Sequence, residues 1–514
     1  MTQSAPQHLT KIVIVGGGTA GWISASMLAF KLRNQLCQVE LIESADIGTI
    51  GVGEATIPPF ITLLRNLGIN EQDFISKTQG SFKLGIEFAN WREKGQQFFH
   101  PFGDFGPKLD GHDFYQCWLK SQAMGDNTPI MDYCPTAIMA YQHKFMPPFM
   151  AAADSPIQLS NYALHFDASL VAKYLRDYAQ GLGVVRHEDT VVEVHNHNNG
   201  FIKALQLQSG KLIEGDLFID CSGFRGLLID KNLNVKYQDW KQWLPCDRAV
   251  AMQTKKVAAP VPYTQSTAED AGWRWTIPLQ HRTGNGYVYS SEFCSDEQAL
   301  TTLQQKVIGM PVNDPRVIPF SSGRREHFWH KNCVSVGLSS GFLEPLESTA
   351  IHLITRSIHF LLVNFPDRQC KQSLVDEYNR AMAWDYEYIR DFIILHYCST
   401  QRNDSEFWRW CQNMSIPDSL QQRISLFKEN AIARHDLDQL FKPESWQCIY
   451  EGMGIRPQTY NHFVDLSDYS QLFSNMQSAK QRAQQSVSSA LNHEAFLKQF
   501  CPAATPTPVN KKGA

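Results

Sequence analysis

The chain has 514 residues, of which 43% are apolar, and its 47 basic and 51 acidic side chains give a formal net charge of -4. The apolar content excludes a disordered protein, and the length exceeds what one hydrophobic core usually supports. Nearly balanced charge provides no strong field for nucleic acid or an anionic membrane, so we expect small neutral partners, no nucleic acid and no membrane.

Residues 10–45 have the pattern of a strand, a glycine turn, a helix and a second strand. Residues 11–15 are rich in β-formers, residues 22–33 have helical spacing, and residues 38–42 alternate up to Glu43. This order is that of a βαβ unit, the part of a Rossmann fold that binds a dinucleotide.

The turn of this unit reads Gly-Gly-Gly-Thr-Ala-Gly from Gly16 to Gly21. Gly16 permits the tight turn, Gly18 lets the backbone approach a pyrophosphate, and Gly21 lets the helix pack against the strand. Glu43 follows at the distance from which an acidic side chain binds ribose hydroxyls. The predicted cofactor-binding residues of this unit are Gly16, Gly18, Thr19, Ala20, Gly21 and Glu43. FAD or NAD would satisfy this geometry, and the fingerprint by itself also fits a plain glycine turn.

Residues 80–88 alternate strictly between small or polar and apolar side chains, which predicts one strand. Lys83 lies on its polar face. Periodicity alone indicates a solvated lysine on an edge strand.

A second place for an extended cofactor follows the apolar segment 217–219. This predicted strand runs into Asp220-Cys221-Ser222-Gly223, where a sheet edge could meet the same ligand.

Two tryptophans, Trp273 and Trp275, alternate in the segment Gly-Trp-Arg-Trp-Thr-Ile-Pro that ends at Pro278. Alternate residues of a strand project from one face, and proline ends the strand. The two indoles can therefore wall a channel against large molecules. The pattern alone also fits two aromatic side chains of a core.

The segment Glu-Pro-Leu-Glu-Ser-Thr-Ala-Ile at 344–351 precedes apolar residues spaced by three and four, which predicts the start of a helix. Free N–H groups at Thr349 and Ala350 can hold an anion. The alternative is an ordinary capped helix, with Ser348 or Thr349 as the cap and Glu347 complementing the helix dipole.

Long helical segments rich in Tyr, Trp and Gln follow, notably 376–398 and 479–500. The twelve cysteines are scattered without a Cys-x-x-Cys pair, which argues against zinc and against a disulfide framework. The first ten residues are polar, and no apolar run is as long as a membrane span. We expect a soluble, unprocessed cytoplasmic protein without a metal.

The ordered set of motifs resembles the flavin-dependent halogenases, the family that includes the tryptophan halogenases, over about residues 10–500. These motifs are the glycine fingerprint, the Gly-x-Phe-Lys strand, Trp-x-Trp-x-Ile-Pro and Leu-Glu-Ser-Thr. The resemblance implies FAD, received as FADH2 from a separate NAD(P)H-flavin reductase, since the chain has a single fingerprint. It further implies chloride or bromide, a small aromatic substrate and a homodimer.

Residue by residue, Lys83 matches the family's essential lysine and Glu347 its catalytic glutamate. Thr349 and Ala350 match the pair whose backbone amides bind halide, although the family's usual glycine is Ala350 here. Leu338 and Ile351 match positions that line the flavin, and His100 and Phe102 match a His-x-Phe pair that sandwiches an indole ring.

The substrate side differs from the family pattern. Glu429 and Asn430 stand where a tyrosine pair holds the amino acid head group, and Phe441 stands where the family has tryptophan. We therefore expect halogenation of indole or an indole derivative rather than free tryptophan. A flavin-dependent aromatic monooxygenase and a non-catalytic flavin-binding protein remain open alternatives.

The expected fold class is α/β, with an FAD-binding Rossmann-type three-layer domain, a β-sheet substrate region and a C-terminal helical subdomain. Residues 1–375 would form the FAD-binding and catalytic module, with substrate-side insertions near 100–160. Residues 376–501 would form a helical subdomain that caps the substrate, and residues 502–514 a disordered tail.

Overall fold

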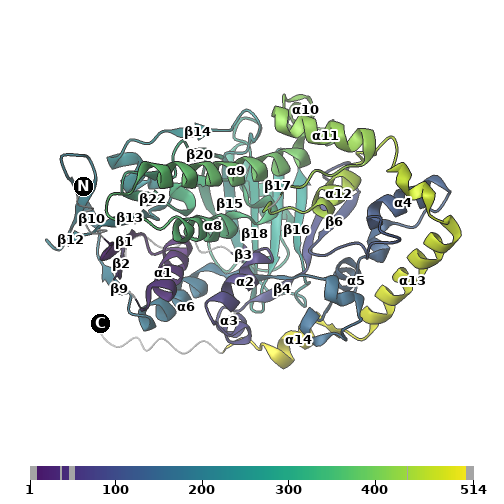
Figure 1. The fold of residues 1–514 in the computed structure, drawn as a ribbon, viewed down its shortest axis with the longest axis horizontal. Coiled ribbons are helices and arrows are strands. Elements are labelled where there is room, and N and C mark those ends of the chain that lie inside the picture. Colours follow the sequence, from purple (N-terminus) through teal and green to yellow (C-terminus); the bar gives the residue numbers. More distant parts are fainter. Residues whose placement is uncertain (1–7, 35–36, 45–52, 437, 505–514) are drawn as a thin grey trace, which may run out of the picture.

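The computed structural model describes residues 8–34, 37–44, 53–436 and 438–504. A six-stranded sheet lies at one end of the molecule, and a larger seven-stranded sheet stands at the centre (Figure 1). The six strands, in spatial order, are β21 (Trp329–His330), β22 (Cys333–Ser335), β13 (Leu217–Asp220), β1 (Lys11–Val15), β2 (Gln38–Glu43) and β9 (Val185–Glu188). All neighbours pair in parallel except β21 and β22.

Alternation along β1 places one layer on each face of this parallel sheet. Ile12 and Ile14 pack into the main core with α1 (Thr19–Leu32). Val13 and Val15 pack into a second core under the antiparallel sheet of β10 (Val191–Asn196), β11 (Ile202–Leu207) and β12 (Leu212–Glu214). Helices, parallel sheet and antiparallel sheet form three layers, which confirms the expected α/β class.

The seven-stranded sheet carries the tryptophan segment at its centre. Its strands, in spatial order, are β19 (Arg316–Pro319), β15 (Arg248–Lys255), β18 (Arg282–Tyr289), β17 (Gly272–Pro278), β16 (Thr264–Glu269), β5 (Gly85–Ala89) and β6 (Gln97–Pro101). Strand β17 ends at Pro278, as predicted, because proline has no N–H to continue the ladder.

The remaining strands form three small sheets. They are β3 (Gly53–Ala55), β8 (Ala163–Asp167) and β4 (Ser81–Lys83); β14 (Tyr237–Asp239), β20 (Gly323–Arg325) and β23 (Gly341–Phe342); and β24 (Leu491–Asn492) with β7 (Lys144–Phe145). The helices besides α1 are α2 (Pro59–Asn66), α3 (Glu71–Lys77), α4 (Phe114–Ala123), α5 (Pro135–Tyr141), α6 (Ala168–Gly181), α7 (Asp296–Lys306), α8 (Ala350–Val363), α9 (Gln372–Cys398), α10 (Glu406–Asn413), α11 (Asp418–Asn430), α12 (Pro443–Gly452), α13 (Tyr469–Ser488) and α14 (His493–Phe500).

The prediction of one strand over residues 80–88 is wrong. The chain forms β4 and β5, which belong to different sheets, and it crosses between them at Leu84. Leu84 donates its N–H to the Pro262 carbonyl and accepts from the Phe102 N–H, so its backbone is satisfied at the crossing. Lys83 lies at this junction and is fully buried, so it is not a solvated edge lysine.

The C-terminal helices only partly match the expectation. Helix α9 covers the predicted segment 376–398, whereas segment 479–500 is broken into α13, β24 and α14 because β24 pairs with β7. The proposed boundary at residue 375 lies inside α9, and side chains on both sides share one hydrophobic core. The division into domains therefore stays a prediction.

Of the tail predicted to be disordered, residues 502–504 are tied down by hydrogen bonds. Ser76 and Gln79 donate to the carbonyls of Pro502 and Ala504. The other ten residues of the tail lie outside the described ranges. Within those ranges, no helix combines the length and apolarity that crossing a bilayer requires.

Candidate active site

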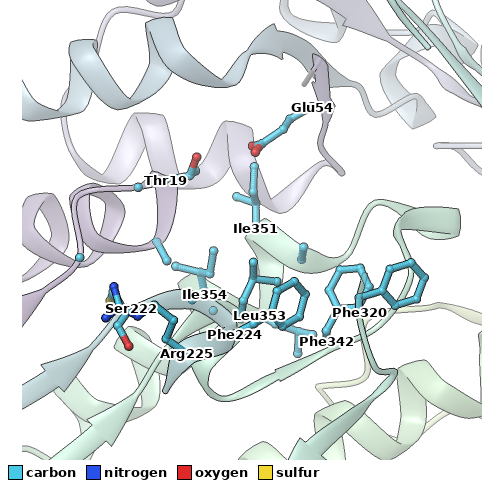
Figure 2. A pocket seen from close by; sticks show the side chains of 18 of the residues that line it. Thr19, Glu54, Ser222, Phe224, Arg225, Phe320, Phe342, Ile351, Leu353 and Ile354 are labelled. Atoms are coloured by element: carbon cyan, nitrogen blue, oxygen red, sulfur yellow. The ribbon is translucent and has the colours of Figure 1, made fainter. Parts of the chain in front are cut away.

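A cavity of about 480 Å³ opens where the parallel strands β1 and β13 end. Figure 2 shows Thr19, Ser222, Arg225 and Ile351 around it. Predicted cofactor residues that line it are Gly16, Gly18, Thr19, Ala20, Glu43, Leu338 and Ile351. Ligands of parallel α/β sheets bind outside the carboxyl ends of the strands, so the cavity lies where a dinucleotide is expected.

The glycine turn explains how the chain leaves this space open. Gly16 has φ +117°, and a Cβ there would lie 2.2 Å from the Cys221 carbonyl oxygen. A Cβ on Gly21 would lie 1.8 Å from the Gly16 oxygen, so Gly21 permits close packing rather than lining the cavity. Nothing lies within 4 Å of a Cβ on Gly18. This cradle, together with the long apolar wall, fits a dinucleotide with its pyrophosphate over the turn.

Alanine at Gly16 and alanine at Gly18 should separate folding from cofactor binding. Gly16→Ala places a methyl group against backbone at a positive φ, so we expect a lower melting temperature. Gly18→Ala should melt like the wild type but bind FAD more weakly, because its methyl group enters the cavity. Thermal unfolding without flavin and fluorescence titration with FAD measure the two effects. Wild-type FAD affinity in Gly18→Ala would contradict the proposed pyrophosphate position.

Glu43 is fixed at the rim of the cavity. Its carboxylate accepts a hydrogen bond from Trp22 Nε1 at 3.2 Å and forms an ion pair with Arg186 at 2.5 Å. These contacts orient the carboxylate from the end of β2, where it is available to ribose hydroxyls.

A second acidic side chain at the cavity, Glu54, was not anticipated. It projects from β3 toward the space beside Thr19 and Ile351 (Figure 2), and its Oε2 is buried without a hydrogen-bond partner among the described residues. Burial, and secondarily the charge of Asp167, raise the Glu54 pKa to about 7. The sequence gave no signal for Glu54, because β3 is only three residues long and shows no periodicity.

Lys83 is held by two neighbours at the junction of the sheets. Its Nζ donates to the Thr56 carbonyl at 3.0 Å and to Ser348 Oγ at 2.9 Å, and it lies 5.1 Å from the centroid of the Phe102 ring. Burial lowers the Lys83 pKa to about 7, although the charge of Glu347 opposes the shift. An amine in this setting exchanges its proton near neutral pH.

Glu347 is a fully buried carboxylate between two histidines. His100 Nδ1 lies 3.1 Å from Oε2, and His396 Nε2 lies 3.0 Å from Oε1. Burial acts to raise the Glu347 pKa, but the two histidines outweigh it and lower the pKa to about 2. The site therefore holds an ionised carboxylate close to an amine that titrates near pH 7.

Ser348 joins this pair of residues to the cavity, and sequence reasoning did not select it. It follows Glu347 in the chain, binds Lys83 and lines the cavity. Its φ of 57° places it in the left-handed region, which turns the chain sharply before α8 begins. The cavity thus reaches within one hydrogen bond of Lys83.

The N-terminus of α8 is not an ordinary capped end. Thr349 occupies the cap position but its side chain makes no capping hydrogen bond, and its Oγ1 is buried without a partner in the described part of the chain. Ala350 lines the cavity. The first N–H groups of the helix therefore retain their capacity to bind an anion.

Aromatic rings lie close to Lys83 and to His100, the histidine that binds Glu347. Phe102 faces Lys83, and the His100 that binds Glu347 lies 6.3 Å from Phe102 and 6.4 Å from Phe441 between ring centroids. Phe441 stacks on Phe392 at 3.8 Å. These predicted substrate residues converge at one place. In contrast, Glu429 and Asn430 are exposed at the end of α11.

The two tryptophans differ in their surroundings. Trp275 lines the cavity, whereas Trp273 is buried and donates from Nε1 to Glu344 Oε2 at 2.8 Å. Tyr397 donates to the same oxygen at 2.5 Å. Burial raises the Glu344 pKa to about 7, despite both hydrogen bonds. Trp275 thus forms part of the cavity wall, and Trp273 packs in the core behind it.

Glu344 should make stability fall as the pH rises. Between pH 4.5, its ordinary pKa, and about 7, the native state binds more protons than the unfolded state, so the free energy of unfolding decreases with pH. Glu344→Gln keeps an acceptor for Trp273 and cannot ionise. Its stability relative to wild type should therefore rise across this window, by about 3 kcal/mol, in urea unfolding at a series of pH values. A constant difference would contradict a neutral Glu344.

Comparisons with known proteins agree with this geometry. The family model described as tryptophan halogenase matches residues 11–469. A tryptophan 6-halogenase from Streptomyces albogriseolus is 35% identical, over 88% of this chain and 90% of that protein. A tryptophan 7-halogenase from Lentzea aerocolonigenes is 34% identical, over 87% and 90%.

Two solved structures are more similar still. A flavin-dependent halogenase from Xanthomonas campestris is 42% identical with a TM-score of 0.93, covering 98% of this chain and all of that chain (100%). One from Brevundimonas sp. BAL3 is 41% identical with a TM-score of 0.92, covering 96% and 99%. The match spans the cavity, Lys83 and Glu347 together. The chain therefore belongs to the tryptophan halogenase family and is a flavin-dependent halogenase.

Proposed function

We propose that the protein is a two-component halogenase that uses FADH2 from a separate reductase, O2, and chloride or bromide to halogenate an indole or indole derivative. The observation that carries this proposal is the position of Ser348, which lines the cofactor cavity and also binds Lys83. An oxidant formed in the cavity has a short route to Lys83 and to the neighbouring Glu347.

The residues around the cavity fit FAD. Gly16 to Ala20 and Glu43 would hold the dinucleotide half, and Leu338 and Ile351 the ring system. The N–H groups of Thr349 and Ala350 would hold the halide. Bound FADH2, with O2 and halide, would supply hypohalous acid. Trp275 would keep the organic substrate out of the cofactor cavity.

Lys83 would direct the halogen. With a pKa near 7, the amine is partly neutral at physiological pH. It can either donate a hydrogen bond to hypohalous acid, or attack its halogen, breaking the O–halogen bond to give a haloamine and water. Both roles need the dry, fixed position that Thr56 and Ser348 give its nitrogen.

Glu347 would act on the ring. When an electron-rich ring attacks the halogen, the bond from halogen to its oxygen or nitrogen carrier breaks and a cationic ring intermediate forms. The carbon that gained halogen still bears its hydrogen, and the positive charge is spread over the rest of the ring. An ionised carboxylate stabilises this charge and accepts the proton. Its low pKa keeps it ionised before the reaction.

The substrate class rests on the aromatic pocket. His100, Phe102 and Phe441 provide flat surfaces for an indole ring. Glu429 and Asn430, at the positions of the family's head-group tyrosines, are exposed and supply no such contact.

The test is reconstitution with FAD, a flavin reductase, NADH, chloride or bromide, and a panel of indoles and tryptophan. Mass spectrometry should detect halogenated products, and kcat/KM should be higher for indoles than for tryptophan. Equal turnover of tryptophan and indole would refute the substrate assignment. A hydroxylated product formed without halide would favour the monooxygenase alternative.

A further inference from the structure

Both ring nitrogens of His396 face hydrogen-bond acceptors. Nδ1 lies 2.8 Å from the Phe392 carbonyl oxygen, one turn earlier on α9, and Nε2 lies 3.0 Å from Glu347 Oε1. The side chain is fully buried, so water does not mediate either contact. A carbonyl oxygen only accepts, and therefore Nδ1 carries a proton.

The contact with Glu347 requires a second proton. A neutral imidazole has a single N–H, which Phe392 already occupies, so Nε2 would present a lone pair to a carboxylate oxygen. Two acceptors at 3.0 Å repel each other unless one of them is protonated. The proton lies either on Nε2 or on the carboxyl group.

The surroundings of Glu347 favour the proton on the histidine. His100 directs its Nδ1 at both carboxylate oxygens, at 3.1 and 3.2 Å, and an ionised carboxylate accepts such bonds more strongly than a carboxylic acid does. The pair of an imidazolium and a carboxylate is also neutral as a whole, which suits a buried site.

We propose that His396 is a positioning residue that carries a positive charge at neutral pH and keeps Glu347 ionised and correctly aimed. This inference rests on the proposed role of Glu347 in halogenation. It gives α9 a role in setting the charge of Glu347, in addition to lining the aromatic pocket and the cavity.

The charge has a consequence for Lys83. The groups that face Glu347 are Lys83 on β4, His100 on β6, His396 on α9 and Cys448 on α12. Burial and neighbouring carboxylates raise the Cys448 pKa well above its usual range, so this thiol stays neutral. An uncompensated carboxylate would bind the proton of Lys83 more tightly. A charged His396 offsets that attraction and leaves the Lys83 amine free to lose its proton.

The next residue on α9 provides a matched control. Tyr397 donates to Glu344, three residues before Glu347, so His396 and Tyr397 bind the same loop from the same helix. Tyr397→Phe removes one hydrogen bond to a carboxyl group without removing a charge. His396→Gln can still donate a hydrogen bond to Glu347 but is neutral.

The direct test is nitrogen NMR of the full-length protein with 15N-labelled histidine. At neutral pH, one buried histidine should have protons on both ring nitrogens, and its signals should be missing from His396→Gln. In Glu347→Gln the same ring should have one proton, on Nδ1. A singly protonated His396 in the wild type would overturn the proposal. This readout needs no turnover, so it is independent of whether the halogenase assignment holds.

The second test is the pH dependence of kcat with indole under limiting halogenase. In His396→Gln the acidic limb should move upward by about 1 to 3 pH units, because removing a nearby cation raises a carboxyl pKa by that amount. Tyr397→Phe should keep the wild-type limb. If kcat has the same pH dependence in wild type and in His396→Gln, the charge of His396 does not act on Glu347 and the residue only packs there. If His396→Gln does not fold, the spectra of wild type and Glu347→Gln still decide the question.

Discussion

Lys83→Ala is expected to abolish halogenation while FADH2 oxidation continues. The amine lies between the cofactor cavity and the aromatic pocket, held by Thr56 and Ser348, and no other described amine shares that position. Loss of a preorganised group at a reacting atom costs about 10²- to 10³-fold, and loss of the group that directs the halogen should cost at least as much. Product yield per FADH2 consumed measures the effect. Retained halogenation at one tenth of the wild-type rate would remove Lys83 from the mechanism.

Lys83→Met separates this chemical role from folding. Between pH 7 and 10.5, the native and ordinary pKa values of Lys83, the unfolded state binds more protons than the native state, so wild-type stability rises with pH. Methionine fills the space without a charge to desolvate. The variant should therefore be more stable than wild type, most clearly below pH 7, and still inactive. Urea unfolding across this range checks the sign.

Glu347→Gln should lower kcat by about 10²- to 10⁴-fold, the usual contribution of a general base. Glutamine fits the site but can neither accept the proton of the ring carbon nor stabilise its charge. FAD binding and hypohalous acid formation should be unchanged, because Glu347 is separated from the cavity by Ser348. Measuring halogenated product and released hypohalous acid in the same reaction gives the rate of halogenation and the rate of oxidant formation.

Glu347→Asp is the matched control for charge. It keeps a carboxylate but shortens its reach, so we expect activity between those of wild type and Glu347→Gln. An aspartate variant no better than the glutamine variant would mean that position matters as much as charge. Full activity in Glu347→Gln would exclude proton transfer to this residue.

Local features of the fold were readable from the sequence. The βαβ unit around Gly16, the strand ending at Pro278 and the start of α8 depend on glycine turns, alternation and helical spacing, which act over a few residues. Motifs at Lys83 and Glu347 identified two residues that the fold brings together through Ser348.

Features that depend on long-range packing were not readable. The alternation at residues 80–88 gave no sign that Leu84 joins two sheets, because that crossing is fixed by Pro262 and Phe102. Nothing in the spacing of His396 distinguishes it from a core histidine, since its partner lies 49 residues away in the chain. The prediction of one helix over residues 479–500 was wrong for the same reason, because β24 within this segment pairs with the distant strand β7.

Helix α9 contacts both the cavity and the Glu347 carboxylate. Tyr386 lines the cavity, and His396, ten residues later, binds Glu347, so the two contacts are about 15 Å apart along one continuous helix. An inserted or deleted residue between them would rotate His396 away by about 100°. Attempts to engineer new substrate specificity should therefore keep the length of this stretch unchanged and vary Phe441, which stacks on α9 but lies outside any helix.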